Sequence, residues 1–553
     1  MKLQSLISSL FFFNNSSVTA RARCTSADPC WPSPHEWSKF NASINGNLIA
    51  SRPSAAVCHG TEYNSALCEN AGVNWVSSDW RTGQPGAYSA ILWELGRDQC
   101  FINSTVSAPC GQGLVAKYTV NASSIEDVQK AVKWADRKNL FLVIKNTGHD
   151  HLGRSSGEGA FAIWTHHLKG RKWHDDFVPQ GAPGGVTGVK AVTLNAGEQW
   201  LDVYRDADKQ GQIIVGGHAR TVGAAGGWAT GGGHSAWSHF YGLGADNIWE
   251  TRIVAADGET KVLNQYTDVD HFWAIRGGAG NSWGVITSIT YKTHPVPTHI
   301  KVVFAQYTTN YSTARRQTLG RIFRALPEIT DAGYTGYGTL GSPIGIILLQ
   351  PNGTNTTAER VTTILKNIGD EAKVDTMAAG MDFPTWIDYV NVFLQDPNVA
   401  TNVVDPSRLL TPDVLLNKTE KLLGVIDDFP DFHPGFNFIG KVDSRNRDQT
   451  AVHSVWKTSR AIFSMGTDWK DDAPESEKRT KRLRMVDVSR RLAEIVGEGG
   501  GTYVNEANPY EPDWKQAFWG EKYSRLERIN RRIDSKGIFV CNRCVGGDLV
   551  YKP

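Results

Sequence analysis

The sequence predicts an α+β fold that is divided into two domains, and three observations lead to this prediction. The chain has 553 residues, and a chain of this length normally folds around two hydrophobic cores instead of one. From about residue 118 to residue 297, apolar runs of strand length alternate with helical patterns. After residue 298 the chain mixes β-rich runs with longer helical stretches, which predicts a second domain.

The first residues predict a secretory signal peptide over 1–22. Lys2 precedes the apolar segment Leu3–Phe13, and Ala20-Arg21-Ala22 has the small-x-small pattern of a cleavage site. The following segment, residues 23–110, is rich in cysteine and tryptophan and poor in helical periodicity. We expect this cysteine-rich N-terminal segment to be tied by disulfides and packed on the first domain, with regular structure beginning near Tyr118.

The cysteines and the glycosylation sequons also predict secretion. An even number of cysteines crowded at the two ends of the chain favours disulfides in an oxidising compartment, with the pairing left open. Cys541-x-x-Cys544 stands alone, so a disulfide is favoured there over a zinc or redox element. The eight cysteines are Cys24, Cys30, Cys58, Cys68, Cys100, Cys110, Cys541 and Cys544. Sequons, typical of a glycoprotein surface, occur at Asn41, Asn103, Asn121, Asn310, Asn352, Asn355 and Asn417.

The first domain is predicted to begin with a helix and a strand. Ser124-Ile125-Glu126-Asp127 has the spacing of a capping box, and apolar residues then recur at helical spacing as far as Ala135. This helix leads into a strand at Leu140–Ile144. Asp257-Gly258 is a strong hairpin signal between two later strands. The further elements expected are strands at Ala160–Thr165, Ala191–Asn195, Gln212–Val215, Ile248–Ala255 and Thr260–Leu263, and a helix near Trp200–Lys209.

The second domain and the C-terminus have weaker patterns. Strands are expected at Val302–Thr308 and Ile346–Leu349, and helices near Ala314–Leu326 and Ala358–Ile368. Near-helical spacing of apolar residues predicts one final helix over Asp513–Ile533.

Two glycine-rich loops interrupt the first domain. One runs from Lys145 to Gly157 and contains His149, and the other lies between Thr221 and His234. Dense glycine costs backbone entropy, which a fold tolerates where the main chain approaches a bulky group closely. Backbone N–H groups in such loops also converge on anions such as a pyrophosphate. Neither loop carries a Gly-x-Gly-x-x-Gly fingerprint or a P-loop, so the loops predict a large cofactor bound outside a Rossmann or P-loop fold.

The two loops resemble those of the berberine-bridge-enzyme-like (BBE-like) branch of the vanillyl-alcohol-oxidase (VAO) flavoprotein superfamily, in particular fungal FAD-linked oxidases of secondary metabolism. The resemblance runs from about Gly111 to Pro297 and resumes at Tyr503-Val504-Asn505 and Phe518-Trp519-Gly520. It implies a PCMH-type FAD-binding domain of two α/β subdomains over 111–297. It further implies a substrate-binding domain with an antiparallel sheet covered by helices over 298–500, and a C-terminal BBE-like segment, 501–553, that returns to the FAD domain.

The same resemblance implies how FAD is held. The histidine that corresponds to His149 is bonded to the 8α carbon of the flavin, and a second bond in many members comes from a cysteine where this chain has Ala219. We therefore expect FAD that is monocovalent through His149. The other cofactor-binding positions implied are Asn146, Thr147, Gly148, Asp150, His151, Gly153, Ser155, Thr221, Gly223, Gly226, Gly227, Gly231, Gly232, His234, Ile286 and Asn505.

The expected chemistry is hydride transfer from a small organic substrate to the flavin, with a base that takes the accompanying proton. The resemblance places this base in the C-terminal third, where Tyr503 and Glu506 are the candidates. Val222 corresponds to a position where a small residue admits oxygen, which implies an oxidase that reduces O2 to H2O2. The substrate expected is an alcohol, a saccharide or a secondary metabolite.

Competing functions are weighed against this hypothesis. The net charge of +2 gives no basic field for nucleic acid, and no run after the N-terminus is long and apolar enough to span a membrane. No metal is expected, because the nearby histidines at 149, 151, 166 and 167 lack a zinc-binding pattern. The alternatives left open are a flavin-dependent oxidative cyclase and a non-catalytic secreted glycoprotein that binds carbohydrate through its 19 tryptophans and 16 tyrosines.

Overall fold

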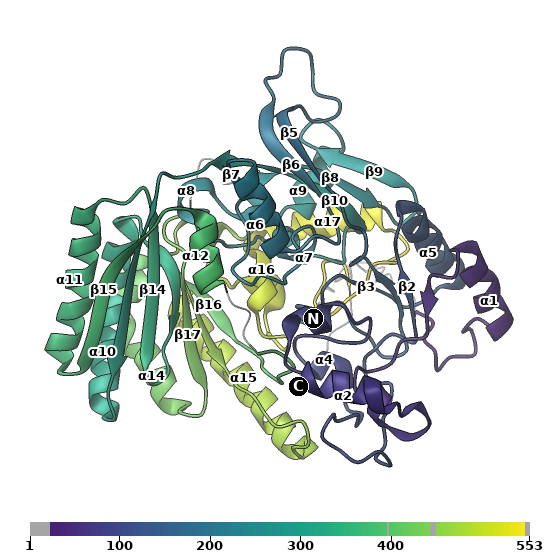
Figure 1. The fold of residues 1–553 in the computed structure, drawn as a ribbon, viewed down its shortest axis with the longest axis horizontal. Helices are drawn as coiled ribbons and strands as arrows, with labels where there is room; N and C mark the ends of the chain where they lie inside the picture. Colours follow the sequence, from purple (N-terminus) through teal and green to yellow (C-terminus); the bar gives the residue numbers. More distant parts are fainter. Residues whose placement is uncertain (1–22, 395–397, 443–448, 548–553) are drawn as a thin grey trace, which may run out of the picture.

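The computed structural model describes residues 23–394, 398–442 and 449–547, so the predicted signal peptide lies outside the described residues. One half of the molecule contains a four-stranded and a five-stranded sheet, and the other contains a seven-stranded sheet (Figure 1). The architecture is α+β, as predicted. Within the described ranges, no helix has the length and apolar character needed to cross a membrane.

The four-stranded sheet carries the first glycine-rich loop. Its order is β1-β2-β4-β3, with β2 and β3 parallel to β4 and β1 antiparallel to β2. The predicted capping box is present, because Ser124 Oγ accepts from Asp127 N at 3.1 Å and the Asp127 carboxylate accepts from Ser124 N. The bounds are β1 Leu48–Ile49, β2 Tyr118–Asn121, α5 Ile125–Lys138, β3 Leu142–Lys145 and β4 Phe161–Trp164.

The five-stranded sheet is antiparallel, with the order β5-β6-β10-β8-β9. The predicted hairpin joins β8 to β9, and its Gly258 has a φ of +75°. Strand β5 was not predicted, because this edge strand is mostly polar and exposed. The bounds are β5 Arg171–Phe177, β6 Val189–Asn195, α6 Trp200–Lys209, β7 Gln212–Ile213, α7 Gly227–Thr230, α8 Ser238–Tyr241, β8 Ile248–Val254, β9 Thr260–Asn264, α9 Val269–Ile275, β10 Val285–Lys292 and β11 His294–Pro295.

The seven-stranded antiparallel sheet contributes residues to two cores, although its edge strand β15 is largely exposed. Val303 belongs to the core that includes residues of the helices α10, α11, α14 and α15, whereas its neighbour Val302 packs in the core that includes Trp200 of the other half. The order is β15-β12-β14-β13-β17-β18-β16, and Figure 1 shows α10 and α11 on the outer side of this sheet. The bounds are β12 Ile300–Thr308, α10 Ser312–Asp331, β13 Thr335–Thr339, β14 Ile344–Pro351, α11 Asn355–Ala372, β15 Asp375–Phe383, α12 Trp386–Phe393, β16 Ser407–Leu410, α13 Pro412–Asn417, α14 Thr419–Asp428, β17 His433–Phe438, β18 Ala461–Gly466 and α15 Glu475–Val496.

The cysteine-rich N-terminal segment has more regular structure than the sequence predicted. It contains the helices α1 Pro34–Ser43, α2 Ser65–Val73, α3 Ser78–Thr82 and α4 Leu92–Leu95, so the expectation that regular structure begins near Tyr118 was wrong. These helices are short, and side-chain caps such as Ser33 begin three of them, so apolar periodicity was a poor guide. The disulfides join Cys24 to Cys30, Cys58 to Cys68, Cys100 to Cys110 and Cys541 to Cys544.

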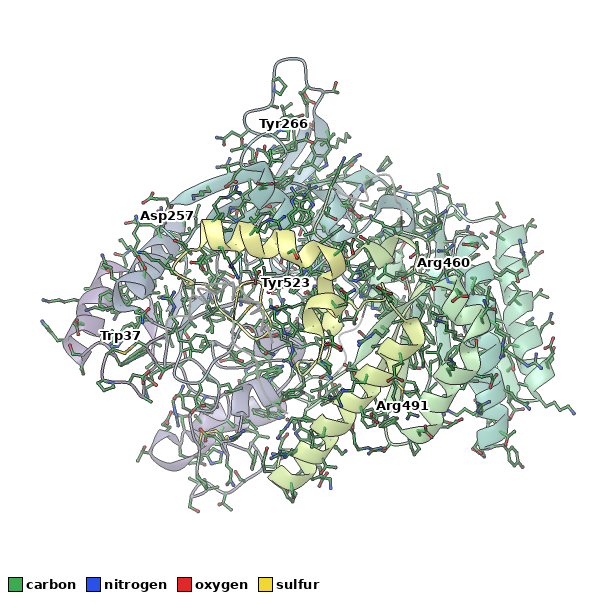
Figure 2. The ribbon with its side chains drawn as sticks, turned by 180° about the vertical axis from the view of Figure 1, so that it is seen from behind. Trp37, Asp257, Tyr266, Arg460, Arg491 and Tyr523 are labelled. Carbon is green, nitrogen blue, oxygen red and sulfur yellow. A yellow bond between two sulfur atoms is a disulfide. The ribbon has the colours of Figure 1, made fainter. Side chains whose placement is uncertain are left out.

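The C-terminal segment lies between the two halves. The single helix predicted over Asp513–Ile533 is instead two helices, α16 Trp514–Trp519 and α17 Tyr523–Ile533. Gly520 separates them, because its φ of +55° ends the helix there. Seen from behind, the helix at Tyr523 crosses the molecule between Trp37 and Arg460 (Figure 2).

Candidate active site

The first glycine-rich loop leaves β3 at Lys145 and is folded around a carboxylate. Asp150 accepts hydrogen bonds from Leu152 N at 3.0 Å and from the backbone and hydroxyl of Ser155 at 2.7 and 2.6 Å. Gly148 has a φ of +84°, and a Cβ there would lie 2.9 Å from the carbonyl oxygen of Ala87. These contacts fix the shape of the loop on which His149 is presented.

His149 is held by two hydroxyl groups through one ring nitrogen. Its Nε2 lies 2.7 Å from Thr221 Oγ1 and 3.2 Å from Ser78 Oγ. Thr221 belongs to the second glycine-rich loop and Ser78 to α3 of the N-terminal segment. The imidazole therefore sits where three separate parts of the chain meet.

The glycines of the second loop serve two different purposes. A Cβ on Gly223 would lie 2.3 Å from Asn146 Nδ2, and one on Gly231 would lie 2.1 Å from Asn505 Oδ1, so these positions need glycine because protein side chains pack against them. A Cβ on Gly227 would meet nothing within 4 Å, and one on Gly226 would meet only Asn146. Gly226 and Gly227 therefore leave room for something outside the protein chain.

A cavity of about 560 Å³ lies between the two loops and the C-terminal segment. This volume is within the usual range for a small-molecule or cofactor site. The cavity brings together most of the site residues predicted from the sequence, namely Asn146, Thr147, Gly148, His149, Asp150, His151, Ser155, Val222, Gly223, Gly226, Gly227, Ile286, Tyr503, Asn505 and Glu506.

Five predicted site residues do not line this cavity. Thr221 contacts His149, and His234 contacts Glu506, so each lies behind a residue that lines the cavity. Gly153 packs against the ring of Trp93, Gly231 packs against Asn505, and Gly232 has a φ of +121°. The three glycines shape the loops instead of facing the cavity.

The cavity also has walls that sequence reasoning missed. Ser89 and Ala90 come from the cysteine-rich N-terminal segment, and a stretch that includes Asn398 and Thr401 comes from the side of the seven-stranded sheet. None of these residues lies in a recognisable motif. The sequence signal for Asn281 was its place in the glycine-rich stretch before β10. The structure shows a constrained turn there, because Asn281 has a φ of +66° and donates a hydrogen bond to Arg154 O.

The C-terminal segment brings a carboxylate to the cavity. Glu506 Oε1 lies 3.1 Å from His234 Nε2, and Glu506 Oε2 accepts from Asn437 Nδ2 at 3.2 Å. Burial raises the pKa of Glu506, but the attraction of His234 and the hydrogen bonds outweigh it and hold the pKa below its usual value. Glu506 is therefore an ionised acceptor for a proton in the cavity.

Tyr503 has the opposite character. It is fully buried, and its hydroxyl oxygen accepts a hydrogen bond from Asn505 Nδ2 at 2.8 Å. Burial, together with the nearby charge of Glu506, raises the pKa of Tyr503 well above its usual value. The phenol therefore stays protonated.

A second carboxylate lies beside the first. His151 Nδ1 is 3.8 Å from Asp405 Oδ2. Burial raises the pKa of Asp405, the attraction of His151 opposes this rise, and the charge of Glu506 adds to it. Two neighbouring carboxyl groups with pKa values shifted in opposite directions are typical of sites that move protons.

The cavity residues fit a flavin nucleotide. Among the described residues, the buried Asn146 Oδ1 has no hydrogen-bond partner, although the amide nitrogen of the same side chain donates to Ala196 O at 2.6 Å. A buried acceptor without a donor is costly unless a ligand supplies one. Together with the open space over Gly226 and Gly227, this points to a polar, ring-shaped ligand against the two loops.

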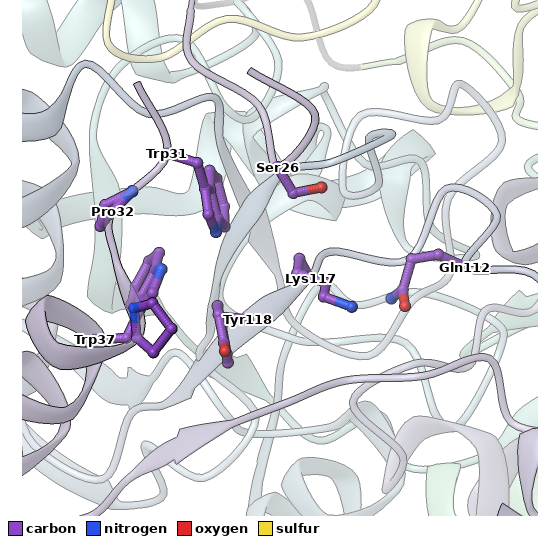
Figure 3. Close-up of a pocket in the computed structure, with 8 residues that line it drawn as sticks. Ser26, Trp31, Pro32, Trp37, Gln112, Lys117 and Tyr118 are labelled. Atoms are coloured by element: carbon purple, nitrogen blue, oxygen red, sulfur yellow. The ribbon is translucent and has the colours of Figure 1, made fainter. Parts of the chain in front are cut away.

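A smaller hollow of about 350 Å³ lies elsewhere, near α1 and β2. Figure 3 shows the rings of Trp31, Trp37 and Tyr118 on its walls, with Lys117 and Gln112 nearby. Its lining residues include Lys117 and Tyr118 but no carboxylate and no histidine. This hollow therefore lacks the carboxylate and histidine groups of the larger cavity.

Comparison with known proteins identifies the family of this chain. Two family models match the chain, "FAD binding domain" over residues 116–264 and "Berberine and berberine like" over residues 502–545. An FAD-linked oxidoreductase of Arthroderma benhamiae is 52% identical over 538 residues, covering 96% of this chain and 95% of that protein. The FAD-linked oxidoreductase patO of Aspergillus clavatus is 32% identical over 542 residues, covering 96% and 93%.

Solved structures lead to the same family. The VAO-type flavoprotein MtVAO615 of Myceliophthora thermophila C1 superimposes with a TM-score of 0.87 at 26% identity, covering 96% of this chain and 98% of that protein. MtVAO713 of the same organism superimposes with a TM-score of 0.88 at 25% identity, covering 97% and 99%. The chain therefore belongs to the berberine-bridge-enzyme-like, VAO-type family of FAD-linked oxidoreductases.

Proposed function

We propose that this protein is a secreted oxidase that transfers a hydride from a small organic substrate to FAD bonded to His149. The observation that carries this proposal is the single cavity in which His149 and both glycine-rich loops face the ionised Glu506. FAD supplies the two-electron acceptor at this site. Residues 111–297 and 501–553 are assigned to cofactor binding, and residues 298–500 to substrate binding.

Attachment through one bond is supported by the residues at the two linkage positions. Glucooligosaccharide oxidase of Acremonium strictum, which has the same fold at 16% identity, contains 6-S-cysteinyl, 8α-N1-histidyl FAD. In this chain His149 lines the cavity, whereas the cavity residue beside Val222 that would supply the second bond is Ala219. Alanine has no nucleophile, so the histidyl bond alone is proposed.

Glu506 is the better of the two candidate bases. Loss of a hydride from an alcohol carbon gives a neutral carbonyl product when the adjoining O–H group also loses its proton, so a base assists the transfer. The raised pKa of Tyr503 keeps this residue protonated, and the lowered pKa of Glu506 keeps this residue ready to accept. We assign proton removal to Glu506, which His234 and Asn437 position. We assign to the protonated Tyr503 a hydrogen-bonding role in the cavity.

Dioxygen is the proposed electron acceptor, with H2O2 as product. Val222, in the second glycine-rich loop, lines the cavity, and the family resemblance associates a small residue at this position with access for O2. Secretion is supported by the four disulfides.

The proposal is tested by three measurements on the purified protein, namely its colour, the mass of the peptide that contains His149, and flavin bleaching by substrate. We expect a yellow protein, a tryptic peptide containing His149 that is heavier by the mass of FAD, and bleaching of the flavin on mixing with substrate from a panel of alcohols, saccharides and alkaloids. Bleached enzyme is then mixed with O2, and H2O2 is measured. A colourless protein, or flavin that is reoxidised only by quinones or dyes, would contradict the oxidase.

A further inference from the structure

Two hydroxyl groups hydrogen-bond to Nε2 of the His149 ring. Nε2 lies 2.7 Å from Thr221 Oγ1 and 3.2 Å from Ser78 Oγ, and the two hydroxyl oxygens are also hydrogen-bonded to each other. Ser78 is 4% exposed and Thr221 is 2% exposed. The two buried hydroxyls and the half-buried imidazole form one hydrogen-bonded network, so these hydroxyls set the orientation of the imidazole at the cavity wall.

Ser78 reaches this network because α3 is fastened to the second glycine-rich loop. Asp79 pairs with Arg220 at 2.8 Å, and Trp80 Nε1 donates to Asn70 Oδ1 at 3.0 Å, which joins α3 to α2. The Cys58–Cys68 disulfide in turn ties α2 to the chain before it. The N-terminal segment thus delivers a hydroxyl to His149 from 71 positions earlier in the chain.

We propose that Ser78 and Thr221 are positioning residues for the formation of the bond between His149 and the flavin. This inference rests on the covalent attachment proposed above. With Nε2 hydrogen-bonded to these hydroxyls, Nδ1 would be the ring nitrogen that bonds the 8α carbon of bound FAD. The Nδ1–C8α bond would form as one C–H bond of the 8α methyl group and the Nε2–H bond break, and the two protons and two electrons released would reduce O2 to H2O2.

A hydroxyl group can hydrogen-bond to Nε2 both before and after the bond to the flavin forms. Before the bond forms, Nε2 carries a hydrogen and donates it to a hydroxyl oxygen. Afterwards Nε2 has only a lone pair and accepts a hydrogen bond from the hydroxyl instead. Serine and threonine hydroxyls both donate and accept, so the network survives the change of protonation without any movement of the ring.

The experiment follows covalent incorporation in apoprotein made under riboflavin starvation. FAD is added, and the flavin that remains with acid-precipitated protein is measured over time, beside the Kd for non-covalent FAD. We expect Thr221→Val to slow incorporation about tenfold and Ser78→Ala about fivefold, as the loss of one buried hydrogen bond implies. Thr221→Ser restores the hydroxyl and is expected to stay within about twofold of wild type, with the Kd for FAD unchanged in all variants.

Thr251→Val is the matched control, because Thr251 is equally buried and its hydroxyl has no partner among the described residues. Wild-type incorporation in Ser78→Ala and Thr221→Val overturns the proposal, and so does a loss of FAD affinity in proportion to the rate. If Thr221→Val does not fold, a wild-type rate in Ser78→Ala alone overturns it. Covalent flavin in His149→Ala would instead refute the attachment site itself, which separates the two failures.

Discussion

Two residues three positions apart have opposite protonation behaviour in the cavity. Burial and the nearby charge of Glu506 raise the pKa of Tyr503, whereas the attraction of His234 and its hydrogen bond to Glu506 lower the pKa of Glu506. The difference arises from the contacts of each side chain, since both face the same cavity. At this scale the proposed chemistry depends on one carboxylate.

Replacement of Glu506 by glutamine removes the proton acceptor and keeps the size of the side chain. General bases contribute about 10²- to 10⁴-fold to rate, so we expect flavin reduction to slow by about that factor while the substrate Kd changes little. Stopped-flow bleaching of the flavin measures both quantities. Glu498→Gln, at an exposed position, is the control. A reduction rate within about twofold of wild type would remove Glu506 from the mechanism.

The pH dependence of reduction gives a second prediction. The base must be ionised, and the pKa of Glu506 lies below its usual 4.5, so the wild-type rate should fall only below about pH 4.5. His234→Asn removes the attraction that outweighs burial, so the pKa of Glu506 rises and the fall in rate moves to higher pH. Rates measured across the acid range in both proteins test this shift. An unchanged profile in His234→Asn would show that another group titrates.

Sequence reasoning identified His149, Tyr503 and Glu506 as candidates because each lies in a short motif. It did not identify Ser78 or Asp405, since nothing around either residue forms a pattern. Ser78 meets Thr221 across 143 positions of sequence, and such a pairing arises only when the N-terminal segment folds onto the loop. Motifs that resemble those of the family therefore gave the candidate reactive groups, and the tertiary structure gave the side chains that contact them.

At the scale of elements, the second glycine-rich loop was easy to locate and hard to interpret. Gly223 and Gly231 are forced by neighbouring side chains, whereas Gly226 and Gly227 face open space. The sequence makes these positions look alike. The element predictions had the same limit, since α6 and the β8–β9 hairpin followed strong local signals, whereas the polar strand β5 and the break at Gly520 did not.

The two kinds of glycine should respond differently to substitution. Gly227→Val places a side chain in the open space, so we expect the fold to persist and FAD loading to fall by at least about tenfold. Gly223→Ala pushes a methyl group into Asn146, so we expect a loss of about 1–3 kcal/mol in the free energy of unfolding. Flavin absorbance per protein and urea unfolding distinguish the two effects. Equal loading in Gly227→Val and wild type would place the cofactor elsewhere.

At the scale of the whole molecule, the seven-stranded sheet is tied to the C-terminal segment by a buried ion pair. Arg408 of β16 donates to both carboxylate oxygens of Glu511, at 3.0 and 2.7 Å, and both side chains are 2% exposed. Arg408 also donates to Ser489 O on α15. Loss of one partner would leave a charge buried between these elements.

Glu511→Gln should therefore lower the free energy of unfolding by about 3–5 kcal/mol. The matched control is Glu62→Gln, which removes the exposed partner of Arg52, where we expect less than about 1 kcal/mol. Thermal and urea unfolding of both variants provide the comparison. Similar changes in the two variants would mean that the buried pair does not hold the elements together.

The place of the C-terminal segment in the cavity wall bears on when FAD can bind during synthesis. Tyr503, Asn505 and Glu506 line the cavity, and Phe539 forms a parallel β-bridge with Leu142 of β3. A nascent chain on the ribosome that still lacks these residues has the first glycine-rich loop but not the complete cavity around it. We therefore expect FAD to be captured after translation ends, and we expect a polypeptide that stops shortly before residue 503 to contain His149 yet to remain colourless.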